Sequence, residues 1–262
     1  TAGTITGLGD EIATASDSGS VAATVLTNLD AVTTGAVGFA SVTTLTGTAT
    51  EIQAAYTANT AGTITGLGNE AVITNDTGTL TAYNTMDAAT TGIITTTLAA
   101  TGAADAFVFN NNVLTIGTGT AYLNGTDSIS FVGAGVVQGT LAESAITNTA
   151  GDDTVVVDGT NTTVYVIDTD TNNLGGSAGS GILDFTSLVN VAAFLTDGIT
   201  ATNEAGETHY FVINDGDVAT AAYVYEFIDA GGNTTIEAAE LKLIGTLTTD
   251  GTATTTADVI VV

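Results

Sequence analysis

The sequence is almost free of basic side chains. Its 262 residues include 28 Asp and Glu but a single Lys or Arg, Lys242, and its formal net charge is −27 at pH 7. Proteins that bind nucleic acid neutralise backbone phosphates with a patch of Lys and Arg, which one lysine cannot form. An anionic membrane surface is excluded as a partner for the same reason. We therefore expect the carboxylates to bind cations.

Other side chains used in chemistry are equally scarce. The chain has no Cys, Pro or Trp, and His209 is its one histidine. Disulfides and thiolate metal sites are excluded, and a zinc site with a lone histidine is not expected. Because few groups remain for nucleophilic or acid–base catalysis, we predict that the protein is not an enzyme. No apolar run reaches the roughly 18 residues that would predict membrane insertion.

The residues that fill the chain favour a folded, strand-rich protein. Hydrophobic residues make up 44% of the sequence and its mean hydropathy is +0.39, whereas disorder needs low hydrophobicity together with high charge. Thr, Val and Ile are β-branched and favour strands. The uncompensated negative charges repel one another, so we expect divalent cations or high salt to stabilise the compact state.

An internal repeat occupies the first part of the chain. Thr1–Gly9 (TAGTITGLG) recurs as Thr60–Gly68, and Leu29–Gly35 (LDAVTTG) is matched by Met86–Gly92 (MDAATTG). We predict a repeat region over residues 1–102, with about two units of close to sixty residues. Such units bury their faces against neighbours. The chain begins without Met or a basic leader, so we expect a processed product or a piece of a longer chain.

Helices and strands alternate in this repeat region. Apolar spacing predicts short helices over Ala22–Ala31 and Thr48–Tyr56. The Thr-rich segment Val42–Thr46 alternates as a strand does.

Residues 103–262 show short β segments separated by turn residues. Asn-Gly and Asp-Gly pairs favour tight hairpins because both residues tolerate a positive φ. The spacing predicts a mainly β fold with a β-sandwich or β-roll-like C-terminal domain. Helices are predicted near Phe185–Leu195 and over Glu237–Ile244. The Asp-Gly pairs begin at Asp158, Asp197, Asp215 and Asp250.

The segment Asp229–Glu240 resembles a twelve-residue calcium loop. Asp229 stands at position 1, Asn233 at 5, Thr235 at 7 with its main-chain carbonyl, and Glu240 at 12. Calcium prefers several hard oxygens on a tight turn, with a final Glu that can bind through both oxygens.

The loop departs from that pattern at positions 3 and 6, which are Gly231 and Thr234. The segment that enters it also resembles a strand rather than a helix. The alternative is an acidic hairpin followed by a helix N-terminus, where Glu237 and Glu240 favour the helix dipole.

A second candidate cation site is Asp168, Asp170 and Asn172, whose oxygens alternate along a loop. The alternative here is a solvated turn. Gly151–Val157 (GDDTVVV) resembles half of a nonapeptide repeat that binds calcium in parallel β rolls. Because such sites need stacked neighbours, a remnant turn is the favoured interpretation of this single copy.

Four segments in the C-terminal part of the chain carry a resemblance: Ser187–Leu195, His209–Gly216, Tyr223–Asp229 and Ile236–Leu247. They resemble the C-terminal region of bacterial RTX-type and S-layer proteins. In those proteins the region accompanies calcium binding and acts as an uncleaved signal for type I secretion, and the apolar end Asp258–Val262 fits such a signal. The tandem nonapeptide array of that family is missing here. The N-terminal repeats are similar to repeats of giant cell-surface proteins of marine cyanobacteria.

These observations together predict a secreted structural protein, located outside the cell at its surface. We expect it to assemble with copies of itself into an S-layer or surface filament, with calcium as the ion that neutralises its carboxylates. The alternative is a calcium-dependent adhesin, whose C-terminal domain binds a cell-surface glycan. Exposed aromatic side chains beside a calcium loop would favour that alternative.

Overall fold

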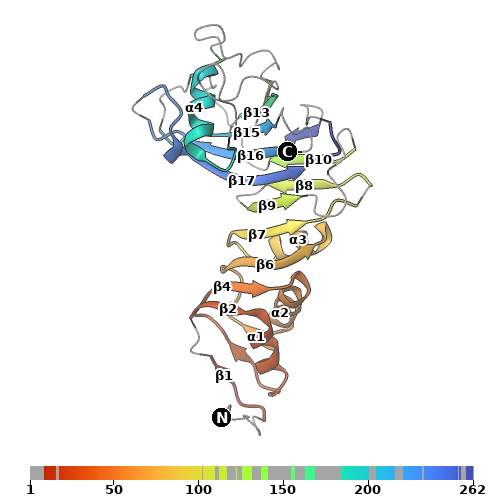
Figure 1. Cartoon of the computed structure of the whole chain (residues 1–262). Helices are drawn as coiled ribbons and strands as arrows, with labels where there is room; N and C mark the ends of the chain where they lie inside the picture. Colours follow the sequence, from red (N-terminus) through yellow and green to blue (C-terminus); the bar gives the residue numbers. More distant parts are fainter. Residues whose placement is uncertain are drawn as a thin grey trace. The chain divides into compact units, whose positions relative to one another are not determined.

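The computed structural model shows a mainly β protein with two compact units (Figure 1). Unit 1 comprises Thr1–Ala99 with Asn112–Leu114, and unit 2 comprises Ala100–Asn111 with Thr115–Val262. The structure describes residues 9–15, 18–101, 103–109, 112–116, 122, 126–131, 137–140, 155–156, 163–168, 184–200, 205–215, 221–231, 233–252, 254 and 258–261.

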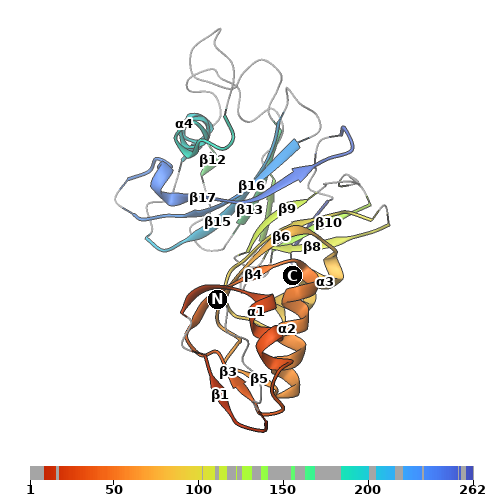
Figure 2. The same cartoon turned by 60° about the horizontal axis from the view of Figure 1, so that its bottom comes forward.

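Unit 1 is built from coils, each a strand followed by a helix that returns the chain to the next strand. The long strands pair in parallel in the order β2-β4-β6-β7, and three short strands form a second parallel sheet. Each coil takes about 25 residues, so one sequence repeat spans two coils. Helix α1 packs against α2, and α2 against α3 (Figure 2). The coils are β2 (Gly19–Ala22) with α1 (Ala23–Asp30), β4 (Val42–Gly47) with α2 (Ala49–Ala61), and β6 (Ala71–Gly78) with α3 (Leu80–Asp87), before β7 (Ile94–Leu98); the short strands are β1 (Ala13–Thr14), β3 (Val37–Gly38) and β5 (Ile64–Thr65).

Threonines at the ends of two strands start the next helices. The Thr48 hydroxyl accepts a hydrogen bond from Glu51 N at 3.2 Å, while Glu51 Oε2 accepts one from Thr48 N at 2.8 Å, so α2 begins with a capping box. Thr79 caps α3 by accepting from Ala82 N at 3.2 Å. The helices predicted over Ala22–Ala31 and Thr48–Tyr56 are confirmed as α1 and α2, as is the strand over Val42–Thr46.

A hydroxyl-rich contact, which we call the Thr-Thr-Gly clasp, joins neighbouring coils at the same place in both repeats. Thr33 Oγ1 donates to the Gly9 carbonyl at 3.1 Å, and Thr34 N donates to the same carbonyl at 2.9 Å. The Thr33 hydroxyl also accepts from Gly35 N at 3.0 Å. The clasp therefore satisfies main-chain groups of the turn that follows α1.

The second clasp repeats this arrangement after α3. Thr90 Oγ1 donates to the Glu70 carbonyl at 2.8 Å and accepts from Gly92 N at 3.0 Å, while Thr91 N donates to the Gly68 carbonyl at 2.9 Å. The glycine is required because the chains almost touch. A Cβ built on Gly92 would lie 2.1 Å from the Glu70 carbonyl oxygen, closer than real Cβ contacts allow.

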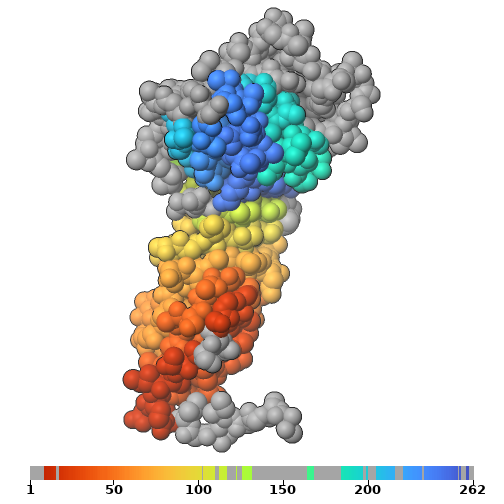
Figure 3. Space-filling model, turned by 90° about the vertical axis from the view of Figure 1, so that its left-hand side faces the viewer, coloured from red at the N-terminus to blue at the C-terminus, as the bar shows by residue number. Residues whose placement is uncertain are grey.

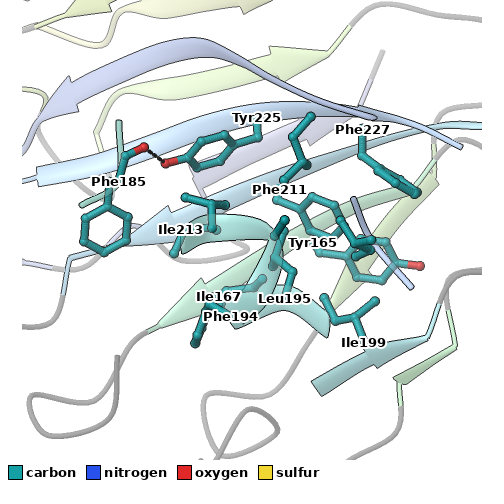
Figure 4. Close-up of a cluster of buried hydrophobic side chains, with 14 residues drawn as sticks. Tyr165, Ile167, Phe185, Phe194, Leu195, Ile199, Phe211, Ile213, Tyr225 and Phe227 are labelled. Carbon is teal, nitrogen blue, oxygen red and sulfur yellow. Dashed lines mark hydrogen bonds between the residues drawn. The ribbon is translucent and has the colours of Figure 1, made fainter. Parts of the chain in front are cut away.

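Unit 2 places five neighbouring strands of the large mixed sheet between a three-stranded sheet and helix α4 (Leu188–Gly198). Phe131 and Tyr210 stack between the two sheets with ring centroids 4.6 Å apart. On the opposite face, Tyr165 and Phe211 of the strands and Leu195 of α4 belong to a buried cluster between the helix and the sheet (Figure 4). The five neighbouring strands of the large sheet are β11 (Val137–Thr140), β13 (Thr163–Asp168), β15 (Thr208–Asn214), β16 (Ala221–Ile228) and β17 (Leu241–Thr248), and the three-stranded sheet has β8 (Ala106–Phe109), β10 (Ser128–Phe131) and β18 (Val259–Val261). The remaining strands are β9 (Val113–Ile116), β12 (Val155–Val156) and β14 (Ile199–Thr200), of which β12 pairs with β14.

Parallel pairing is commoner in unit 2 than the turn signals predicted. Only β15 with β16 and β16 with β17 are antiparallel among its pairs of described register. The connection between β15 and β16 begins at Asp215, and Gly216 of the predicted turn lies outside the described residues. The prediction of a hairpin at Asp197-Gly198 was wrong, because α4 continues through both residues. The helix predicted near Phe185–Leu195 is confirmed as α4. The helix over Glu237–Ile244 was wrong: a 3₁₀ turn, Ala238–Glu240, leads into β17, which pairs with β16.

Buried tyrosines predict how the fold responds to alkali. Burial raises the pKa of Tyr56, Tyr83, Tyr122 and Tyr225 well above the usual 10.0. A raised pKa means that the folded state favours the protonated phenol, so this stability is complete below pH 10 and falls as pH rises beyond it. We expect tyrosinate absorbance to appear together with loss of circular dichroism as one alkaline transition. Formation of more than three tyrosinates near pH 10 in a still folded chain would contradict the burial of these four of the seven tyrosines.

Candidate functional site

The segment predicted to bind calcium forms the connection between β16 and β17. Asp229 follows β16 directly, and the chain enters the 3₁₀ turn Ala238–Glu240 before β17. The main chain of Asp229 extends the strand pairing, since its N donates to the Glu207 carbonyl at 2.9 Å and its carbonyl accepts from Gly206 N at 2.7 Å. The pairing holds the start of the loop against the residues that precede β15.

The Asp229 carboxylate is buried with one oxygen unused. The residue is 3% exposed, and its Oδ1 accepts from Gly231 N at 2.6 Å. Its Oδ2 is fully buried and accepts no hydrogen bond from any described residue. A buried uncharged group without a partner costs about 1–3 kcal/mol, and a carboxylate costs more. The Asp229 Oδ2 atom therefore lacks both a hydrogen-bond donor among the described residues and a counter-charge.

Glu240 binds the loop's own main chain. Its Oε1 accepts from Ala230 N at 2.9 Å, and its Oε2 accepts from Glu237 N at 2.9 Å. Because Ala230 adjoins Asp229, the two predicted carboxylates are brought to the same end of the loop. The Glu240 side chain is buried, and both of its oxygens already hold an amide hydrogen.

The other two predicted ligands lie farther toward the surface. Asn233 Oδ1 accepts from Thr235 N and from Thr235 Oγ1, each at 2.8 Å. Asn233 Nδ2 donates to Glu237 Oε1 at 2.9 Å. The Asn233 side chain therefore organises the exposed tip of the loop, and the structure joins it by hydrogen bonds to Thr235 and Glu237 rather than to Asp229.

A cation at Asp229 would need ligands besides carboxylates. Calcium takes six to eight oxygens, including main-chain carbonyls, amides and waters. Within the described part of the chain, no three His, Asp or Glu side chains gather into a possible metal site. The donor set here is thus Asp229 Oδ2 with Glu240 nearby, completed by neutral oxygens or water.

The second predicted cation site is only partly described. Asp168 is the last residue of β13, where it pairs with Asn214 of β15. Asp170 and Asn172 lie outside the described residues, as do Gly151–Asp153 of the nonapeptide-like segment.

The one histidine lies inside unit 2. His209 of β15 is buried, and its ring contacts Tyr165 and Phe227 at centroid distances of 6.3 and 6.1 Å. Its Nε2 lies 3.7 Å from Glu207 Oε2. Lys242 of β17 lies 3.8 Å from Glu226 Oε2 and remains partly exposed.

Sequence reasoning missed a buried carboxylate in unit 1. Glu70 is 1% exposed, accepts a hydrogen bond from the Tyr56 hydroxyl, and accepts from Gly68 N at 2.8 Å and Asn69 N at 3.2 Å. The signal that marks it is its place in the repeat, since Glu11 follows Gly9 as Glu70 follows Gly68.

Comparison with known proteins identifies no relative. No family model, no curated protein and no solved structure matches the chain. None of the helices in the described residues is long and apolar enough to cross a membrane.

Proposed function

We propose that this protein is a secreted structural component that assembles outside the cell into an S-layer or surface filament, assisted by calcium. The stacked coils of unit 1 carry this proposal. Successive strands pair in parallel and the clasps recur with the sequence repeat, so the same contacts can add coils without changing the fold. An architecture of this kind suits an extended surface protein.

The charge of the chain supports a role for cations. With 28 Asp and Glu against one basic residue, mutual repulsion opposes both folding and the approach of a second copy. Calcium outside the cell would reduce that repulsion. We infer that one ion binds at Asp229, where the unpartnered Oδ2 would gain a counter-charge, with Glu240 beside it.

We further propose a β-roll-like or sandwich-like arrangement for unit 2. Two sheets face each other through the Phe131–Tyr210 stack, and parallel strands such as β11, β13 and β15 are typical of rolls. This arrangement would agree with the resemblance to RTX-type proteins secreted by type I systems.

The adhesin alternative finds less support in the side chains. Glycan binding by stacking needs an exposed aromatic ring, and the chain has seven Tyr and eight Phe. Every one of these fifteen residues is described, and all are buried except Tyr210 and Tyr223, which are half-buried. Tyr210 stacks on Phe131 and Tyr223 on Phe185, each at 4.6 Å, so neither ring is an open platform.

Calcium titration of the chelated full chain tests the proposal. We expect calcium to raise the free energy of unfolding, by about 2.7 kcal/mol at one hundred times the dissociation constant. Ordered sheets or filaments should then appear by electron microscopy. Asp229→Asn should weaken calcium binding about tenfold or more, because it removes the anionic ligand.

Asp250→Asn is the matched control. Asp250 carries the same charge in unit 2, but it is exposed and caps its own turn by accepting from Thr252 N at 3.1 Å. Equal calcium affinity for the two variants would overturn the Asp229 site. A protein that stays monomeric with calcium and binds sugar would instead favour the adhesin.

A further inference from the structure

The first coil of unit 1 is the outermost one in the described stack, yet its exposed side chains resemble those that are covered by a neighbouring coil in the second repeat. Its strands β1 and β2 stand at the ends of their sheets, each paired with a single described strand, β3 and β4 respectively. Figure 3 shows this coil, in red, at the surface of unit 1.

The first observation is a carboxylate that changes from buried to exposed between repeats. Glu70 is covered by α2 of the preceding coil, whose Tyr56 hydroxyl donates to it. Glu11 has the equivalent position, because Gly35 packs on its carbonyl as Gly92 packs on that of Glu70, with the same 2.1 Å to a built Cβ. Glu11 is nevertheless exposed. Compared with Glu70, this site lacks a hydroxyl donor among the described residues.

The second observation is a set of apolar side chains on the same coil. Val25 is 45% exposed, whereas its equivalent in the second repeat, Ala82, is buried and its carbonyl accepts a hydrogen bond from Gln53 of α2. Val32 and Ile12 are 47% and 80% exposed. A coil that ends a stack normally presents a polar outer face. This one presents an apolar face, which is costly in water.

The third observation is that the segment linking α2 to β5 has the same sequence as the start of the chain. Thr60–Gly68 continues from α2, closes that helix at Gly62, and forms β5, which pairs with β3. Thr1–Gly9 has the same nine residues. A coil with the sequence Val42–Asn59 would therefore join Thr1 through a junction that already exists in this chain.

We propose that the face formed by Glu11, Ile12, Val25 and Val32 is a docking site for one further coil of the same repeat. The occupant is a strand and helix of the Val42–Asn59 type, whose tyrosine donates a hydrogen bond to Glu11 as Tyr56 does to Glu70. The interface continues the packing already present between α1 and α2 and between α2 and α3. This inference deepens the proposed function, on which its role in assembly rests, by naming the surface at which the stack grows.

The test adds that coil to the full chain. A copy of Val42–Asn59 is fused directly before Thr1, and the protein is studied as a monomer without calcium. We expect helical circular dichroism to rise by about one helix of the length of α2, and amide exchange of β1 and β2 to slow at least tenfold. In the extended chain, Glu11→Gln should lower the folding equilibrium constant about tenfold, whereas in the original chain it should have no measurable effect.

A matched extension in which the added tyrosine is replaced by Phe separates the hydrogen bond from packing. In this Phe-containing extended chain, Glu11→Gln should leave the folding equilibrium constant unchanged, while the increase in helical circular dichroism should remain. An added segment that stays unfolded would overturn the inference. So would an original chain that is a dimer through β2, because the occupant would then be a second copy. Failure of calcium to produce ordered assemblies would overturn the proposed function and leave this result unaffected.

Discussion

Gly92→Ala is expected to lower the free energy of unfolding by about 3 kcal/mol or more, because the second clasp has no room for a methyl group. The new Cβ would lie 2.1 Å from the Glu70 carbonyl oxygen and 2.8 Å from Ala71 N. Both are main-chain atoms at the start of β6, so neither can rotate away as a side chain would. Relief requires β6 and β7 to separate, which would break the hydrogen bonds that Thr90 and Thr91 donate. Chemical denaturation monitored by circular dichroism measures this loss.

Two other glycines provide controls for this result. Gly78→Ala in β6 should change stability by no more than about 1 kcal/mol, because its nearest contact would be Ala49 Cβ at an ordinary 3.5 Å. Gly35→Ala meets the same 2.1 Å contact in the first clasp, but this coil has a neighbour on one side only among the described residues. We expect it to loosen the first coil and to cost less than Gly92→Ala. Equal, small effects at all three positions would contradict the role given to the clasp.

The second large effect is expected at Asn112, which belongs to unit 1. This residue is 2% exposed. Its Nδ2 donates to Asp87 Oδ1 and to Tyr83 Oη, both at 2.8 Å, while its Oδ1 accepts from Ile94 N at 2.7 Å. Asn112→Asp would place two carboxylates in contact and remove the donor that joins them. We expect a loss of about 3 kcal/mol or more in the free energy of unfolding.

Exchange of the two groups should reverse much of that loss. In the double variant Asn112→Asp with Asp87→Asn, the amide lies on the other side and can donate to the new carboxylate. Ile94 N and the Tyr83 hydroxyl can donate to it as well. The measurement is a double-mutant cycle in denaturant, with a coupling energy of about 1–3 kcal/mol expected. Asn69→Asp is the control, since Asn69 is exposed and the first repeat already has Asp10 at that place. Additive losses without rescue would contradict the described contacts.

Local structure in unit 1 could be predicted because it depends on nearby residues. Helices α1 and α2 follow apolar spacing, and the strand from Val42 follows alternation. That each repeat contains two coils could not be predicted. Parallel pairing joins residues such as Val37 and Ile64, and nothing near either residue marks its partner. The Thr-Thr-Gly clasp was visible as a repeated string, but its contacts with Gly9 and Gly68 come only from the stacking.

In unit 2 long-range packing outweighed local signals. Asp197-Gly198 is a turn sequence, yet α4 continues through it because Val191 and Leu195 are buried in the cluster that also holds Phe211. Leu241–Ile244 has apolar residues compatible with a helix, but pairing with β16 makes it a strand. For the candidate site, the Asp229–Glu240 connection could be located from its oxygens. The sequence did not reveal that Glu240 binds main-chain amides or that one Asp229 oxygen is left over.

The clasps are made entirely of hydroxyl and peptide groups, and neither kind gains or loses a proton across ordinary acid or alkali. The carboxylates that carry the charge are separate from them, except where Glu11 and Glu70 lend a main-chain carbonyl. Acidification, dilution into fresh water or exchange of one cation for another therefore changes the electrical character of the surface without breaking the bonds of the clasps. The contacts that join the coils are thus chemically separate from the groups that titrate or bind ions. The stack of coils can therefore stay intact when the pH or the ionic composition around it changes.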